Sequence, residues 1–186
     1  MTQTTIETGV RQWTIDPSHS EVTFSVRHLM ISTVRGNFTS VSGTATFDPQ
    51  DIEGGSVDVE IDVASIDTGD ENRDGHLRSG DFFDVENHPA ITFNSTTVRN
   101  ASGNQYEIAG DLTILGTTKP VTLQAEFTDV VPDPFGGYRV GVSAETSIDR
   151  TEFGLTWNQA LETGGFLVGD EVTITLEVQL VKSETD

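Results

Sequence analysis

The sequence predicts an all-β protein: a single antiparallel barrel of eight strands, with one short helical crossover near residues 70–80. Apolar and polar residues alternate along most of the chain, which is typical of strands with one buried and one exposed face. Clusters of Gly, Pro, Asn and Asp separate the alternating runs and mark turns. Because the apolar faces of so many strands must cover one another, we expect the sheet to close on itself.

The alternating runs follow one another along the chain. The clearest runs are residues 57–63 and 172–180, where Val, Ile and Leu alternate with acidic residues, Thr and Gln. Weaker runs are Val22-Phe24-Val26, Ile91-Phe93, Tyr106-Ile108, Leu112-Ile114, Val121-Leu123-Ala125-Phe127 and Tyr138-Val140-Val142-Ala144. We expect the apolar members of these runs to face one shared interior.

Turn signals divide the chain into about eight or nine strands; they lie at residues 16–17, 48–49, 54–55, 102–104, 132–137 and 164–165. We interpret residues 1–186 as one domain with an ordered core at about 11–182. A sandwich of two sheets would also bury the apolar faces. Long strands such as 21–30 and 171–182 favour the barrel, since in a sandwich they would leave exposed edges.

One segment, residues 67–84, lacks alternation. Asp70 is suited to cap the N-terminus of a short helix, with Glu71 in its first turn. Gly75 and Gly80 disfavour a long helix. The segment therefore predicts one or two helical turns that cross an end of the barrel.

The composition limits the possible partners. The net charge of −20, from 30 acidic and 10 basic residues, argues against nucleic-acid binding and against docking on anionic membranes. Such an acidic surface either keeps the protein strongly hydrated, for example at high salt, or binds a basic partner. No stretch approaches the roughly 18 apolar residues of a membrane helix, so no stable membrane insertion is expected.

Two further features bear on location and chemistry. The chain has no Cys, which excludes disulfides and thiolate metal sites. Its first dozen residues lack the basic start and apolar run of a secretory signal, so we expect a cytoplasmic protein.

Motifs of known enzyme classes are absent: the chain has no GxSxG, HExxH, Walker or dinucleotide-binding signature. His19, His28, His76 and His88 are scattered without metal-ligand spacing, and no metal site is predicted. Asp16, Ser18 and His19 share one turn, where capping is a simpler role for them than a catalytic triad.

One histidine and one cluster of basic residues each allow more than one interpretation. His28 continues the inward register of Val26, which makes it either a hydrogen-bonded core histidine or the anchor for the polar head of an apolar ligand. Arg73, His76 and Arg78 either pair with the acidic residues of the same segment or leave one arginine free at the mouth of a cavity.

The chain resembles the YceI-like family, whose members are lipid- or polyisoprenoid-binding proteins. The stretches that carry the resemblance span nearly the whole chain and are 13–28 (WTIDPSHSEVTFSVRH), 34–38 (VRGNF), 72–84 (NRDGHLRSGDFFD), 88–93 (HPAITF), 110–123 (GDLTILGTTKPVTL), 150–157 (RTEFGLTW) and 168–174 (VGDEVTI). The resemblance implies a lipocalin-like barrel that carries or stores a polyisoprenoid, an isoprenoid quinone or a fatty-acid derivative, without catalytic residues. Many members carry a secretory leader, a feature that this sequence does not show.

Residues and resemblance together predict a non-catalytic carrier with no cofactor other than a bound lipid, and a possible homodimer. The expected ligand-binding residues are the inward apolar positions together with His28 and Arg78: Phe24, Val26, His28, Phe38, Val59, Ile61, Val63, Arg78, Phe93, Leu112, Ile114, Leu123, Phe127, Phe153 and Trp157. Two alternatives stay open: an enzyme with His28 as general base, and a structural barrel filled by its ten Phe and other large side chains.

Overall fold

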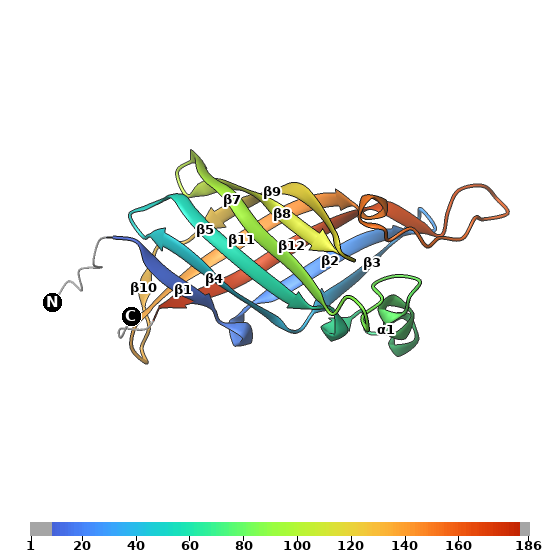
Figure 1. Cartoon of the computed structure of the whole chain (residues 1–186), viewed down its shortest axis with the longest axis horizontal. Coiled ribbons are helices and arrows are strands. Elements are labelled where there is room, and N and C mark those ends of the chain that lie inside the picture. The colour runs from blue at the N-terminus through green and yellow to red at the C-terminus, as the bar shows by residue number, and fades with distance from the viewer. Residues whose placement is uncertain (1–8, 183–186) are drawn as a thin grey trace.

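The computed structural model describes residues 9–182 and consists almost entirely of antiparallel strands (Figure 1). The elements in chain order are β1 (Arg11–Ile15), η1 (Pro17–His19), β2 (Glu21–His28), β3 (Ser32–Phe38), β4 (Val41–Asp48), β5 (Asp51–Asp62), η2 (Val63–Ser65), β6 (Ile66–Asp67), α1 (Glu71–Arg78), β7 (Ala90–Ser102), β8 (Gln105–Ile114), β9 (Thr117–Phe127), β10 (Val131–Pro132), β11 (Tyr138–Asp149), η3 (Arg150–Phe153) and β12 (Val168–Lys182).

Eight of these strands form a closed ring in the order β11–β9–β8–β7–β5–β4–β1–β12, and β12 returns to β11. The closing ladder runs without interruption from the pair Tyr138–Lys182 to the pair Asp149–Glu171. This ring confirms the predicted antiparallel eight-stranded barrel. A barrel of this size is just wide enough for side chains or for one slim ligand.

Strands β1 and β2 occupy successive positions along the same edge of β12. β1 pairs with β12 at Leu180 and Val181, whereas β2 pairs with residues 168–177. The turn η1 separates the two strands, and Asp16 caps it as predicted by accepting the Ser18 N–H (3.0 Å). The wall beyond this break continues through β3 and the two-residue strand β6.

The crossover from β5 to β7 contains η2, β6 and α1, which confirms the helical segment predicted near residues 70–80 (Figure 1). Asp70 is the N-cap and accepts the N–H groups of Asn72 and Arg73. We call the end of the barrel beside α1 the helix end. At this end β5 stops at Asp62, because the Asp62 carboxylate caps η2 by accepting the Ala64 N–H.

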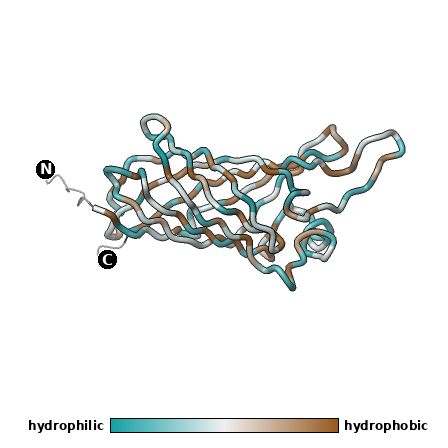
Figure 2. Tube along the Cα trace, turned by 45° about the horizontal axis from the view of Figure 1, so that its top comes forward, coloured by the Kyte–Doolittle hydropathy of each residue, from teal (hydrophilic) through white to brown (hydrophobic). Residues whose placement is uncertain are grey.

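The inward and outward registers follow the sequence pattern. Along β5 the acidic residues are exposed, while the apolar residues between them are buried or half-buried. Figure 2 shows the resulting alternation of hydrophilic and hydrophobic residues along the strands. Val63 is a correction to this pattern: it is buried in η2 rather than at the end of the strand, because the cap at Asp62 ends β5 one residue earlier.

No helix within residues 9–182 is both long and apolar enough to cross a membrane.

Candidate ligand-binding cavity

The barrel contains an apolar cavity in the half nearer to α1. The unfilled space is about 1140 Å³, including the part that opens to solvent. Its wall is formed by six ring strands, by β2 and β3, and by residues of the crossover and of the segment after β11. The lining residues are Val22, Thr23, Phe24, Val26, Phe38, Val59, Ile61, Leu77, Phe82, Phe83, Ile91, Phe93, Leu112, Ile114, Val121, Leu123, Thr146, Ile148, Arg150, Leu155, Val168, Val172, Ile174 and Leu176.

The wall offers apolar surface only. Thr23, Thr146 and Arg150 are its polar residues, and none of them exposes a polar atom to the cavity. A cavity of this chemistry attracts hydrocarbon and gives a polar headgroup no hydrogen-bond partner. The ligand chemistry that it favours is therefore a slim apolar chain.

Large aromatic side chains fill the other end of the barrel, which we call the closed end. Trp13 stacks on Phe47 with ring centroids 5.1 Å apart, and Phe127 meets the edges of both Phe47 (5.9 Å) and Tyr106 (5.2 Å). Trp13, Phe47 and Phe127 are all buried. These rings end the cavity inside the barrel, so it has the form of a pocket rather than a tunnel through the molecule.

Residues of the crossover roof the cavity at the helix end. Leu77, Phe82 and Phe83 contribute to the wall. Outside them, the His76 ring lies edge-on to Phe82 (5.1 Å) and to Trp157 (4.7 Å), which ties the crossover to the segment after β11. The roof is thus held to the barrel by side chains rather than by a long strand ladder.

Side-chain hydrogen bonds hold the crossover to its own backbone. Arg78 Nη2 donates to Ile66 O (2.8 Å) and Arg78 Nε to Ala64 O (3.0 Å). Arg73 donates to Thr68 Oγ1 (2.7 Å) and Thr68 O (2.9 Å). In the described part of the chain, His76 is the one member of this basic cluster with the acidic partner expected from the sequence, with 2.9 Å between its Nε2 and Asp81 Oδ2. The two arginines therefore donate to backbone carbonyls and to the Thr68 hydroxyl, because α1 lies against the start of the crossover.

Arg150 is a buried charge in the cavity wall that the sequence analysis did not identify. It is 3% exposed, and it donates to the carbonyls of Leu155 (2.5 Å), Trp157 (3.0 Å) and Gly169 (2.7 Å). Burial lowers the pKa of its guanidinium, while the carboxylate of Asp170, at 3.5 Å, opposes part of that shift. Its guanidinium therefore fastens the segment after β11 to β12, and its stem faces the cavity.

The structure divides the predicted ligand-binding residues into two groups. Nine of them line the cavity: Phe24, Val26, Phe38, Val59, Ile61, Phe93, Leu112, Ile114 and Leu123. The others lie outside its wall: His28, Val63, Arg78, Phe127, Phe153 and Trp157. Phe127 belongs to the aromatic cluster of the closed end, and Phe153 is buried in η3.

His28 does not continue the inward register into the cavity. It pairs with Ser32 and Val168 at the end of β2, and the pairing of β2 with β12 shifts register between Val168 and Val172. Such a bulge re-aims side chains and interrupts the strict alternation on which the prediction depended. Neither a ligand anchor nor a general base inside the cavity is therefore found at this position.

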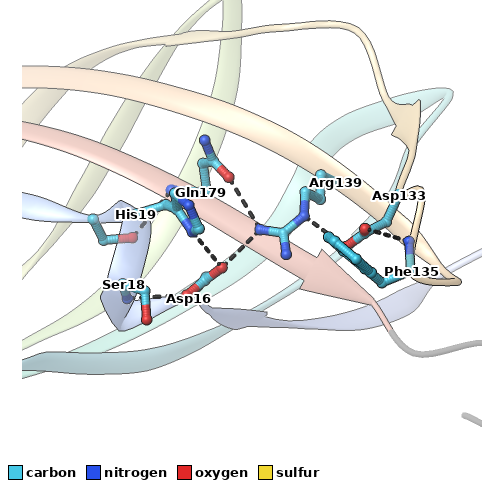
Figure 3. Close-up of polar contacts among 8 residues, drawn as sticks. Asp16, Ser18, His19, Asp133, Phe135, Arg139 and Gln179 are labelled. Atoms are coloured by element: carbon cyan, nitrogen blue, oxygen red, sulfur yellow. Dashed lines mark hydrogen bonds and ion pairs between the residues drawn. The ribbon is translucent and has the colours of Figure 1, made fainter.

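The residues of the Asp16 turn belong to a polar network at the closed end (Figure 3). Asp16 Oδ2 accepts Arg139 Nη1 (2.7 Å) and lies 2.9 Å from His19 Nδ1, while Arg139 Nε donates to Asp133 (2.6 Å). The hydrogen bond from Arg139, followed by that from His19, lowers the pKa of Asp16 to about 2. Ser18 takes part through its backbone N–H, so the turn is capped and no triad is formed, as predicted.

A closed antiparallel barrel of eight strands with an apolar pocket belongs to the class of barrels whose interior is wide enough for one slim ligand. Within this class, the family model of the YceI-like domain matches residues 13–180. The chain belongs to the YceI-like family, which confirms the resemblance seen in the sequence.

Relatives and solved structures agree with this assignment. A UPF0312 protein of Staphylococcus aureus is 36% identical over 173 residues, which cover 92% of this chain and 98% of the relative. A UPF0312 protein of Vibrio cholerae is 38% identical over 138 residues, which cover 74% of this chain and 73% of the relative. BcnA of Burkholderia cenocepacia superposes with a TM-score of 0.76 at 29% identity, covering 89% of this chain and 98% of BcnA. A YceI protein of Campylobacter jejuni superposes with a TM-score of 0.73 at 32% identity, covering 85% of this chain and 90% of that protein.

Proposed function

We propose that the protein binds a long-chain apolar lipid, a polyisoprenoid or an isoprenoid quinone, in its cavity and catalyses no reaction on it. The observation that carries the proposal is an apolar pocket with one closed end and one end roofed by a separate segment. A slim chain would enter from the helix end and extend toward the aromatic cluster.

Burial of hydrocarbon would supply the affinity. Each Å² of apolar ligand surface removed from water contributes roughly 25 cal/mol, so a prenyl chain needs few polar contacts. The polar head of the ligand would remain at the helix end, because the wall offers it no partner.

Two comparisons support the family and the fold on which this choice of ligand rests. The chain belongs to the YceI-like family, and its fold is shared with a polyisoprenoid binding domain of Saccharophagus degradans (TM-score 0.68, covering 91% of this chain and 97% of that domain). The identity to that domain is 14%, so this likeness supports the fold, and the ligand is our proposal.

The two alternatives fit the geometry less well. An enzyme with His28 as general base would need that side chain in the cavity wall, where it does not lie. A barrel filled by large side chains describes the closed end only, since a cavity remains between Phe24, Ile61 and Phe93.

The direct test is organic extraction of natively purified protein, followed by mass spectrometry. We expect a prenyl lipid or quinone that co-purifies with the protein. Protein that is reproducibly free of lipid, and that takes up neither quinones nor prenols, would contradict the proposal.

Filling the cavity provides a matched pair of variants. Val59→Trp would place a large ring in the pocket, whereas Glu60→Trp adds the same ring to the exposed face of the same strand. We expect Val59→Trp to weaken the binding of a fluorescent prenol by about tenfold or more, since each ~1.4 kcal/mol lost is tenfold. Glu60→Trp should bind normally. Equal affinity in both variants would place the ligand elsewhere.

A further inference from the structure

Four apolar side chains are exposed to solvent at the helix end, on the β2–β3 turn and on the loop before β12. We call them the apolar tip: Leu29, Met30, Ile31 and Phe166, with Met30 71%, Ile31 79% and Phe166 59% exposed. Met30 Sδ lies 3.4 Å from the point that a Cβ on Gly165 would occupy, and the Leu29 N–H donates to Leu167 O (2.8 Å). The turn and the loop therefore form one surface, which projects beyond the barrel (Figure 1).

The backbone of the turn is unusual for the residues that it carries. Leu29 and Met30 have φ angles of +52° and +59°, and the Ile31 N–H closes the turn on His28 O (3.1 Å). Gly, Asn and Asp are the residues that favour this conformation. Bulky apolar side chains here cost conformational energy without packing into the core, a pattern that points to a contact outside the chain.

The charge on the β2–β3 side of the tip differs from that of the rest of the molecule. Residues 22–47 contain no Asp or Glu, although 30 of the 186 residues are acidic. This stretch carries the exposed residues Arg27 and Arg35, and Arg27 Nη2 donates to Met30 O (2.9 Å) at the base of the tip. Acidic residues belong to the loop side of this end: Glu162 is exposed in the loop that carries Phe166, and Asp170 and Glu171 are exposed at the start of β12. The turn itself is apolar with basic residues behind it.

The tip also lies beside the cavity. Val26 and Val168 line the pocket, and the paired residues His28 and Val168 connect this part of the wall to the turn and the loop. A partner that binds the tip would therefore lie close to the helix end of the pocket.

We propose that the apolar tip docks the helix end on a phospholipid bilayer. Met30, Ile31 and Phe166 enter the acyl boundary, and Arg27 and Arg35 lie at the level of the headgroup phosphates, the arrangement of surface-bound proteins. At physiological ionic strength the Debye length is about 8 Å, so most of the acidic surface is screened from the membrane. The contact is peripheral and reversible, and it does not depend on what the cavity holds.

The closed end supplies a matched control. Phe135, on the turn between β10 and β11, is 94% exposed, and its N–H donates to the carboxylate of Asp133 (2.9 Å). Asp129 precedes the same turn. An exposed aromatic ring with acidic neighbours is a poor membrane contact.

The test is flotation of the full chain with vesicles of equimolar phosphatidylcholine and phosphatidylglycerol at about 0.15 M salt. We expect the wild type and Phe135→Ser to float equally. The double variant Met30→Ser/Ile31→Ser should lose binding by about tenfold or more, since two side chains leave the apolar phase. Arg35→Glu should weaken binding about fivefold or more through the loss of one cation and the gain of one anion near the headgroups. Circular dichroism should show that the variants keep the fold.

Three outcomes would overturn the proposal: a wild type that does not float, an equal loss for Phe135→Ser, or unchanged flotation of the double variant. A dimer in light scattering that the double variant abolishes would assign the tip to a second copy of the chain instead. Val59→Trp separates this proposal from lipid binding in the cavity, because it should bind vesicles normally while its pocket is filled.

Discussion

The two ends of the barrel are built from the same alternating strands but have opposite properties. At the closed end, stacked rings fill the interior, and Arg139 joins Asp16 to Asp133 across the outside (Figure 3). At the helix end the interior is hollow, and a short crossover covers it. The comparison teaches that an apolar inward face does not by itself make a barrel solid: both ends have one, and the cavity remains at the helix end.

Pairs of inward positions illustrate the difference. Trp13 and Phe47 occupy inward positions of β1 and β4 at the closed end, while Val22 and Val172 occupy those of β2 and β12 at the helix end. Interiors pack densely wherever the side chains can meet. At the closed end the rings of Trp13 and Phe47 stack on each other, whereas Val22 and Val172, on the neighbouring strands β2 and β12, belong to a wall that encloses unfilled space.

Breaking the closed end should have the largest effect on stability. Trp13→Ala removes a fully buried ring that stacks on Phe47, and should lower the free energy of unfolding by about 3–5 kcal/mol. Trp13→Phe should cost much less, because Trp13 Nε1 has no hydrogen-bond partner among residues 9–182. Chemical denaturation measures both. Equal costs would show that the indole N–H matters more than the volume of the ring.

At the helix end, removing the buried charge of Arg150 should have the second-largest effect on the free energy of unfolding. Arg150→Met keeps the stem in the cavity wall but leaves the carbonyls of Leu155, Trp157 and Gly169 without their donor, which should cost about 3 kcal/mol. Hydrogen exchange should show faster opening of residues 154–169 than of the closed end. Uniform exchange across the molecule would mean that Arg150 stabilises the whole barrel rather than this segment.

The polar network of the closed end should give the smallest effect, and one that depends on pH. The pKa of Asp16 is lowered from 3.8 to about 2, so its carboxylate stabilises the fold above pH 3.8, and this contribution is lost as the pH falls toward about 2. Asp16→Asn should cost about 1 kcal/mol at neutral pH and little near pH ~2. Denaturation at both pH values tests this. An equal cost at both would contradict a role for the charge of Asp16.

The sequence predicts the wall of the cavity better than its ends. Alternation of period two identifies which side chains face inward, which is why Val59, Ile61 and Phe93 were correctly expected to share one interior. Alternation does not tell how far along the barrel a residue lies. Phe127 therefore could not be distinguished from the wall residues, although it lies in the aromatic cluster.

The crossover itself was expected at an end of the barrel, but the residues with which it roofs the cavity escaped prediction for a different reason. Leu77, Phe82 and Phe83 lie in a segment without strand periodicity, so no register indicated that they face the cavity. The bulge that turns His28 aside depends on tertiary pairing with β12 and leaves no local signal. Arg150 lies in a stretch that resembles the family, but burial of its charge depends on carbonyls up to 19 residues away along the chain.

The short strand β6 has a consequence for how the pocket could admit a bulky molecule. Only the pairs Asn37–Asp67 and Phe38–Ile66 join β3 to the crossover, whereas an unbroken ladder of residues 138–149 with 171–182 closes the ring. Displacing the crossover would break these two pairs and the packing of the buried Ile66 and Phe82, while every hydrogen bond of the ring would stay in place. Widening the pocket in this way would leave the strand pairing of the ring intact.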